Sequence, residues 1–286
     1  MPRQSRDRRK SGVSVKLTAR DEALFAALGR FGIAHSSDLG RLLFPGRHRD
    51  VLAARLRRLY DSSFLEAHVL DRAAENVYSL GPRGRAWLHG RGGTVRGVPR
   101  PPWYHHLGIV SLWSGIAAAT HQVEGLRLAR FLPDWEIREC GSAAGLEIVP
   151  DALIELVGYV DGQPRPVRLA VELDRGTESL EVLRRKVRTI AGRSFMDWPA
   201  FDLIVLLDAA GQSREQKIRE LLAREYPRQS RIWTPQSSLP SELRHLAGLA
   251  EPPATDSRYG NGMLSEPSQD SAERSGVTGE GLSGDD

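Results

Sequence analysis

Three acidic side chains on two neighbouring predicted strands could bind a metal ion. Asp151 lies in one predicted strand, and Glu172 and Asp174 lie two residues apart near the end of the next, so the latter two share a face. Between the strands, Asp161-Gly162 is a typical central pair of a two-residue hairpin turn, and that turn places Asp151 opposite Glu172. Opposed side chains lie about 5 Å apart at Cβ, where two acids repel unless a positive charge lies between them. Pro164 and Pro166 leave a longer turn open.

Carboxylate oxygens are the ligands that Mg²⁺ prefers, and a site with few protein ligands leaves room for water and phosphate. We therefore expect Mg²⁺ as the cofactor, with Asp151, Glu172 and Asp174 as its ligands. Lys186 lies at the edge of an apolar helical stripe, so its stem could pack while its ammonium reaches the acids. The alternative is an ordinary exposed lysine beside Arg184 and Arg185.

The elements around these residues predict a mixed sheet flanked by helices. We expect helices and strands in the order α, β, β, β, α, β, α, β, at residues 103–121, 135–140, 145–160, 166–174, 179–192, 201–209, 213–226 and 230–235. In this order, the segment WEIREC at 135–140 is the first strand.

The acids and their order resemble a known nuclease fold. Pro150-Asp151, then Glu172 after a hairpin, then a crossover helix look like the PD-(D/E)xK fold. The lysine that this motif carries two residues after its acid is replaced here by Asp174, and nuclease-like folds can place the lysine on a neighbouring helix, where Lys186 lies. The string VELDRGTES, with Lys186 and HHLGIV, resembles the bacterial replication-relaxation family over about residues 17–235. That resemblance implies a role in plasmid replication and relaxation.

Residues 17–89 predict three helices, a hairpin and a further helix. The third helix, at about 47–60, should place Val51, Leu52, Leu56 and Leu59 inward and arginines outward. The order resembles a bacterial winged helix-turn-helix, whose third helix enters the major groove, where arginine bonds guanine. The expected DNA contacts are Arg47, His48, Arg49, Arg55, Arg57 and Arg58 on this helix and Arg72 on the wing. Alternatively, these arginines form the solvent-exposed face of an amphipathic helix in a protein-interaction module.

Charge is divided unevenly along the chain. Residues 1–98 carry 19 Lys and Arg against 9 Asp and Glu, residues 99–250 carry 19 against 19, and the remainder carries 2 against 8. A basic first part favours double-stranded DNA as the partner. Arginine outnumbers lysine 36 to 4, however, which a GC-rich genome alone could cause. The expected segments are a disordered basic arm (1–16), the winged helix (17–89), a linker (90–102), the nuclease-like domain (103–248) and a disordered acidic tail (249–286).

The sequence predicts a cytoplasmic α+β protein of two domains. Cys140 is the single cysteine, so no internal disulfide forms, and the longest central uncharged stretch, Leu107 to Thr120, is 14 residues, short of the ~20 that span a membrane. The sequence contains no GxxxxGK[ST] loop, and the adjacent histidines of Tyr104-His105-His106 lack relaxase spacing. We expect His105 and His106 at the start of a helix, where they border the acids.

The favoured function is an accessory DNA-binding factor in plasmid replication or relaxation. A Mg²⁺-dependent endonuclease or nickase and a transcriptional regulator are the alternatives. A homodimer and contacts with plasmid replication or transfer proteins stay open as further partners.

Overall fold

The computed structural model describes residues 14–70, 75–140, 148–191, 201–207, 212–226, 230–234 and 237–250. These residues belong to one compact unit, Met1–Glu251. Most of the predicted basic arm, nearly all of the predicted acidic tail, and Arg72 lie outside the described residues. In the part of the chain that the structure describes, no helix combines the length and the apolar character needed to cross a bilayer. The domain boundaries stay a prediction.

The first half of the described chain combines helices with a small antiparallel sheet in which β3 lies between β1 and β2. At the first helix, the backbone N–H and the hydroxyl of Thr18 both donate to the Asp21 carboxylate, each at 2.7 Å, and these bonds cap the start of the helix. The elements are α1 (Ala19–Phe31), β1 (Ile33–His35), α2 (Ser36–Leu43), α3 (Arg49–Asp61), β2 (Leu65–His68), β3 (Val77–Leu80) and α4 (Pro82–His89).

The second half is built on a mixed sheet of order β4-β5-β6-β7-β8. The β4–β5 and β5–β6 pairs are antiparallel, whereas the β6–β7 and β7–β8 pairs are parallel. The elements are α5 (Tyr104–Thr120), β4 (Leu126–Pro133), α6 (Asp134–Glu139), β5 (Ala152–Val160), β6 (Gln163–Asp174), α7 (Leu180–Ala191), β7 (Asp202–Leu207), α8 (Gln212–Glu225), β8 (Ser230–Trp233) and α9 (Leu239–Ala247).

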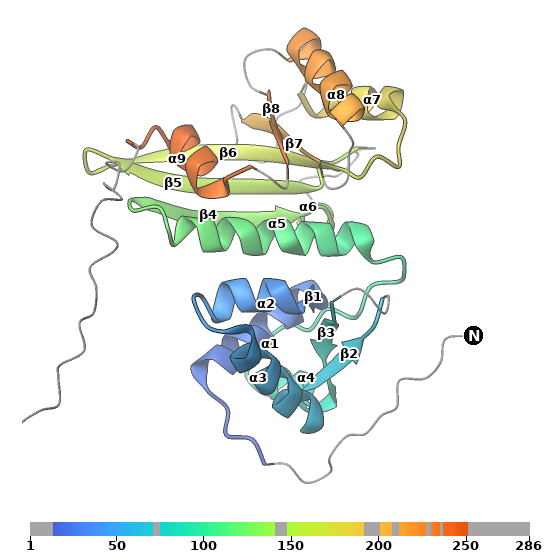
Figure 1. The fold of residues 1–286 in the computed structure, drawn as a ribbon, viewed down its shortest axis with the longest axis vertical. Coiled ribbons are helices and arrows are strands. Elements are labelled where there is room, and N and C mark those ends of the chain that lie inside the picture. Colours follow the sequence, from blue (N-terminus) through green and yellow to red (C-terminus); the bar gives the residue numbers. More distant parts are fainter. Residues whose placement is uncertain are drawn as a thin grey trace, which may run out of the picture. The chain divides into compact units, whose positions relative to one another are not determined.

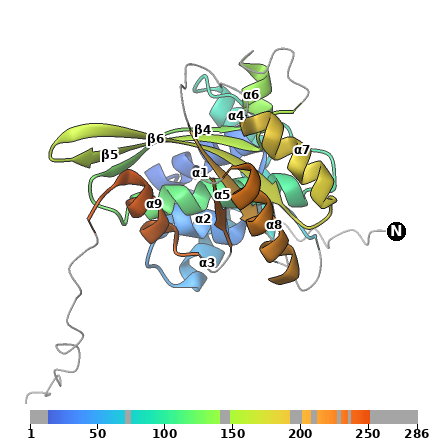
Figure 2. The same cartoon turned by 90° about the horizontal axis from the view of Figure 1, so that it is seen from above.

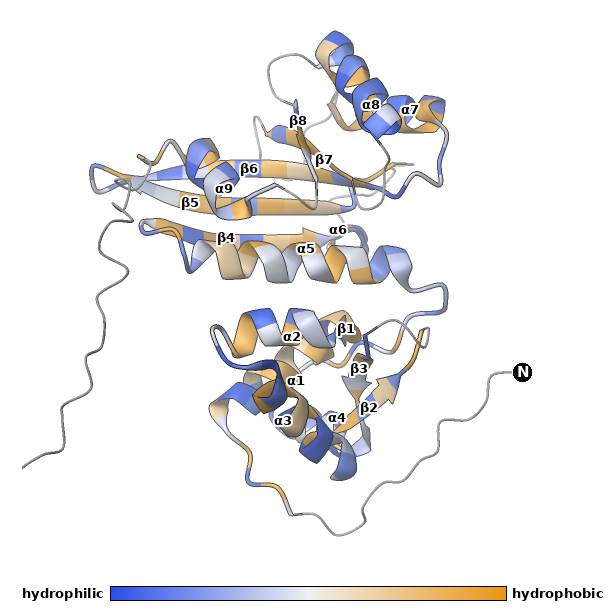
Figure 3. Cartoon of the chain, in the orientation of Figure 1, coloured by the Kyte–Doolittle hydropathy of each residue, from blue (hydrophilic) through white to orange (hydrophobic). Residues whose placement is uncertain are grey.

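Helices cover both faces of this sheet, as predicted. Figure 1 shows α5 on one face and α7 and α8 on the other, and α9 lies beside α5 (Figure 2). Alternation along β5 separates two buried clusters: Ile154 faces the α5 cluster, whereas Leu153 faces the α7 and α8 cluster. Figure 3 accordingly colours the middle of β5 and β6 as hydrophobic and much of α8 as hydrophilic.

The β5–β6 hairpin has the register that the sequence predicts. Val160 pairs with Gln163, so Asp161-Gly162 forms a two-residue turn, and their φ values of 52° and 75° are those that a tight hairpin turn requires. Pro164 and Pro166 are both accommodated inside the pairing. At the other end, Ala152 pairs with Val171, which brings Asp151 and Glu172 to the same position along the sheet.

Two sequence expectations were wrong for this half. Residues 135–140 fall largely in a helix, α6, and the first strand is instead β4, which ends at Pro133. Pro133 is the N-cap residue of α6. The negative charges of Asp134 and Glu136 in the first turn stabilise the helix through their attraction to the positive end of its dipole. Helix α9 follows the last predicted strand and was not anticipated.

A buried carboxylate joins α2 to α5. Asp38, 1% exposed, accepts hydrogen bonds from Ser111 Oγ at 2.9 Å, from Ser114 Oγ at 2.8 Å and from Arg41 Nη1 at 3.2 Å. Arg41 also donates to Ser114 Oγ at 2.7 Å. A buried charge is tolerated when its oxygens are occupied in this way, so the network fixes the helical first half against α5.

Candidate functional site

The three predicted acids gather at one edge of the sheet. Asp151 directly precedes β5, and Glu172 and Asp174 end β6; because these strands are antiparallel, the start of one meets the end of the other. All three are buried, with exposed fractions of 8%, 1% and 4%. The Leu173 N–H donates to Asp151 Oδ2 at 2.7 Å, which anchors Asp151 to the neighbouring strand.

Lys186 reaches this edge from α7. Its Nζ lies 2.6 Å from Glu172 Oε1 and 3.0 Å from Glu178 Oε2. On α7, Leu183 and Val187 are buried on the side that faces the sheet, and Lys186 lies between them. The helix periodicity thus packs the aliphatic stem and delivers the ammonium to the acids.

Glu172 is the most strongly perturbed acid of the cluster. Burial and the nearby Asp151 raise the pKa of Glu172 to about 8, although Lys186 acts in the opposite direction. The pKa of Lys186 is also raised: burial lowers it, but the attraction and hydrogen bond of Glu172 outweigh burial. The two shifts conflict in part, because a protonated Glu172 attracts Lys186 less. We conclude that Lys186 stays charged and that Glu172 binds a proton more readily than an ordinary glutamate.

His105 and Asp134 complete the cluster; His105 borders the acids, as the sequence predicts, whereas Asp134 was not anticipated. His105 Nε2 lies 3.2 Å from Asp151 Oδ1, and this hydrogen bond raises the pKa of His105. Burial, with Asp151, raises the pKa of Asp134. The sequence did hold a signal for Asp134, because Pro133-Asp134 repeats the dipeptide Pro150-Asp151.

Asp174 is held apart from the other two acids. It lies on the same face of β6 as Glu172, but Arg214 of α8 donates to both of its carboxylate oxygens at 2.7 Å. Over the described residues, no three His, Cys, Asp or Glu side chains are grouped so that they could hold a metal ion. The structure therefore brings Asp151, Glu172 and Lys186 together, and Asp174 belongs to a separate ion pair.

The raised pKa of Glu172 predicts a pH-dependent stability. The folded chain holds a proton that the unfolded chain loses, so this contribution is present below pH 4.5 and is lost as the pH rises through about 8. The loss amounts to at most about 1.4 kcal/mol per pH unit. Glu172→Gln should abolish it, so the stability of the variant relative to the wild type should rise between pH 4.5 and about pH 8 in urea unfolding with EDTA. Parallel pH profiles for wild type and variant would contradict this, and exposed Glu22→Gln is the control.

A second group of predicted residues lies on the outer side of α3. Arg47, His48, Arg49, Arg57 and Arg58 are exposed, and we call them the α3 basic surface. Arg57 also pairs with Asp61 at 3.0 Å. The expectation that Val51 faces inward was wrong, because it is 49% exposed.

Val51 shares an outer stripe with other exposed positions on α3 and just before it. Residues 47, 51, 54 and 58 follow a helical period, and all four are exposed. This spacing was available in the sequence.

Arg55, in contrast, is bound within the fold. Its guanidinium donates to both oxygens of Asp21, which is 1% exposed, and to the carbonyl of Lys16 at 3.0 Å. Burial alone would raise the pKa of Asp21, but the hydrogen bonds from Arg55 and Thr18 outweigh it and lower that pKa. The structure gives Arg55 a role in joining α3 to the start of α1.

Arg55→Ala should therefore destabilise the fold. It leaves Asp21 buried without its cation, which costs about 2 kcal/mol of unfolding free energy near neutral pH. Because the pKa of Asp21 is lowered on folding, this contribution is present above its ordinary value of 3.8 and disappears at lower pH. Urea unfolding measures the difference. Exposed Arg58→Ala is the matched control on the same helix and should change stability by less than about 0.5 kcal/mol; equal losses in both variants would refute the assignment.

A model of the replication-relaxation family matches residues 25–190 of the 286-residue chain. The chain belongs to the replication-relaxation family. In this replication-relaxation protein, the matched segment contains α3, Asp151, Glu172 and Lys186, whereas Arg214 lies beyond it. Searches of curated proteins and of solved structures found no match. Family membership indicates a role in replication or relaxation.

Proposed function

We propose that this protein binds duplex DNA through α3, the recognition helix of a winged helix-turn-helix, and serves plasmid replication or relaxation. The single observation that carries the proposal is the α3 basic surface: after Arg55 is assigned to the fold, five cationic or imidazole side chains are still exposed on or just before one helix. The element order α1-β1-α2-α3-β2-β3 supports it, since a third helix followed by a hairpin is the winged-helix arrangement.

Val51 adds a second kind of contact to this surface. An exposed apolar side chain beside arginines can touch the methyl group of thymine, while arginine bonds guanine O6 and N7. Mobility shifts with plasmid-derived duplexes test the proposal. Arg49→Ala and Arg57→Ala should weaken binding, whereas Arg127→Ala, an exposed arginine on β4, should not. Unchanged affinity in both α3 variants would exclude α3 as the reading helix.

A second proposed activity is Mg²⁺-dependent cleavage of DNA by a domain of the PD-(D/E)xK type. The observation that favours it is the 2.6 Å contact of Lys186 with Glu172, because a relocated lysine would replace the one that Asp174 displaces. Asp151 and Glu172 would hold the ion; Glu172 Oε2 is buried and has no hydrogen-bond partner among the described residues, which fits an additional cation. Bound Mg²⁺ would polarise a phosphate and acidify a water.

Incubation with supercoiled plasmid and Mg²⁺ tests this activity. We expect nicked circles with the wild type and none with Asp151→Ala or Glu172→Ala. Glu22→Ala, an exposed substitution on α1, should nick like the wild type. Absence of nicking with Mg²⁺, Mn²⁺ and Ca²⁺ alike would leave DNA binding as the function of the protein.

A further inference from the structure

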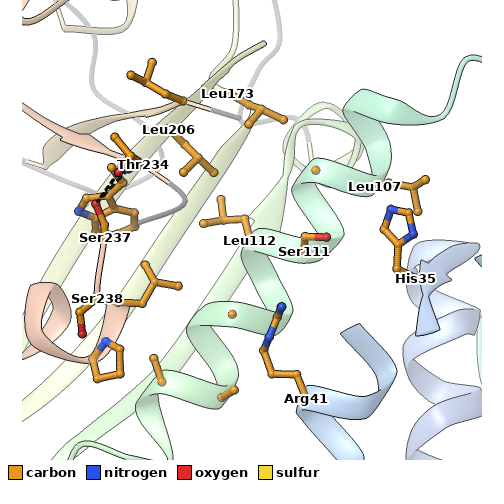
Figure 4. Close-up of a pocket in the computed structure, with 18 of the residues that line it drawn as sticks. His35, Arg41, Leu107, Ser111, Leu112, Leu173, Leu206, Thr234, Ser237 and Ser238 are labelled. Carbon is orange, nitrogen blue, oxygen red and sulfur yellow. Dashed lines mark hydrogen bonds between the residues drawn. The ribbon is translucent and has the colours of Figure 1, made fainter. Parts of the chain in front are cut away.

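A pocket of about 690 Å³ lies between α5 and the carboxyl ends of the parallel strands. One wall is α5, the opposite wall is formed by the ends of β6, β7 and β8 and the start of α9, and His35 and Arg41 approach from the first half (Figure 4). Its volume is in the range of small-molecule sites, about 300 to 1,000 Å³. Open α/β sheets bind ligands at this edge. We call it the α5 pocket.

The lining of the α5 pocket suits an anion with an apolar part. Leucine side chains from α5 and the sheet form its floor, among them Leu112, Leu173 and Leu206 (Figure 4). Arg41 and Arg175 supply positive charge, and no aspartate or glutamate is among the lining residues that the structure describes. Arg41 is ion-paired with the buried Asp38 at 3.2 Å, which compensates much of its charge, so Arg175 is the principal arginine for an anion in this pocket.

An aromatic ring stands at one end of this pocket. Tyr104, in the first turn of α5, is 51% exposed. The Arg175 guanidinium lies 5.0 Å from the centre of its ring. An exposed aromatic ring beside arginine is the usual platform on which proteins stack nucleic-acid bases.

We propose that the α5 pocket binds one nucleotide unit, with the base on the Tyr104 side and the phosphate on arginine. A nucleotide joins a planar base to an anionic phosphate. The lining offers a complementary partner for each part, an aromatic ring for the base and an arginine for the phosphate. The unit could be a free nucleotide or an unpaired nucleotide of a DNA strand, and the two share this chemistry. The proposal is separate from duplex binding, because no residue of α3 lines the pocket.

Isothermal titration calorimetry on the full chain tests the proposal. Deoxyadenosine monophosphate is the main probe, with deoxyadenosine, inorganic phosphate and a short oligodeoxyadenylate as the other arms. We expect the nucleotide to bind more tightly than either the nucleoside or inorganic phosphate. Tyr104→Ala should weaken nucleotide binding about tenfold through lost stacking, and Arg175→Gln about tenfold through a lost charged hydrogen bond.

Matched controls separate this site from general effects of substitution. Tyr159→Ala removes another exposed tyrosine, 44% exposed in β5, and Arg127→Gln removes an exposed arginine; neither residue lines the pocket. Both should bind the nucleotide like the wild type, and thermal unfolding should show every variant folded.

Tighter binding of the oligonucleotide, with the same Tyr104 dependence, supports a DNA strand as the source, whereas equal or weaker binding supports a free nucleotide. No binding, equal loss in the controls, or phosphate binding as tight as nucleotide binding overturns the proposal.

Discussion

Lys186→Met is expected to reduce Mg²⁺-dependent nicking of supercoiled plasmid by about 100-fold or more. In the folded chain the Lys186 ammonium lies 2.6 Å from Glu172, at the acid cluster where a scissile phosphate would bind. Methionine keeps the length and packing of the stem but removes the charge that would stabilise the phosphoryl oxygens. The readout is the rate of conversion of supercoiled to open-circular plasmid.

Lys217→Met is the matched control for this prediction. Lys217 is an exposed lysine on α8, so its substitution should leave nicking unchanged. Lys186→Met also removes the partner of a buried glutamate, and therefore thermal unfolding and duplex binding must be measured on the same preparation. If the Lys186→Met protein is folded, binds DNA and nicks plasmid like the wild type, Lys186 takes no part in cleavage. This conclusion holds whether or not Asp151→Ala abolishes nicking.

The sequence could place the acid cluster because its determinants are local. The turn Asp161-Gly162 sets the register of β5 and β6, and the register alone brings Asp151 to Glu172. The position of Lys186 follows from the same kind of argument, since a helical period places it beside Val187 on the buried side of α7. Patterns of this kind need no knowledge of distant contacts.

Other features depend on contacts between distant segments and could not be read from a pattern. Asp174 shares a face with Glu172, yet Arg214, 40 residues further along, binds both of its carboxylate oxygens in a separate ion pair. In the sequence, Arg55 cannot be distinguished from the exposed arginines around it. In the fold, its guanidinium binds Asp21, which lies 34 residues earlier in the chain. In both cases the partner of a charge, and not its position on the element, decides its role.

The error over residues 135–140 has a different origin. Trp135 and Ile137 alternate with the charged residues Glu136 and Arg138, which is the period of a strand, but a six-residue segment is too short for periodicity to separate strand from helix. The end of β4 at Pro133 and the acids of the next turn decide in favour of the helix. This helix carries Asp134 to the cluster, so the misassigned segment is also the one whose site residue was missed.

The combined substitution of Arg47, Arg49 and Arg58 by glutamine is expected to weaken duplex binding by on the order of 100-fold, at about 1 kcal/mol for each lost contact. All three side chains are exposed on or just before α3, so the fold should be unaffected. Where an arginine contacts phosphate, its loss also reduces the magnitude of the negative slope of log affinity against log salt concentration by about 1. Fluorescence anisotropy across a salt series measures both quantities.

The salt series separates the α3 basic surface from net charge alone. Replacing Arg127, Arg185 and Arg219, exposed arginines on β4, α7 and α8, removes the same formal charge from other surfaces. If general attraction between a basic protein and DNA causes binding, both triple variants lose affinity and salt dependence alike. If α3 lies in the groove, the α3 triple variant alone shows the loss at every salt concentration, and its discrimination between cognate and random duplexes narrows because base contacts as well as phosphate contacts are gone.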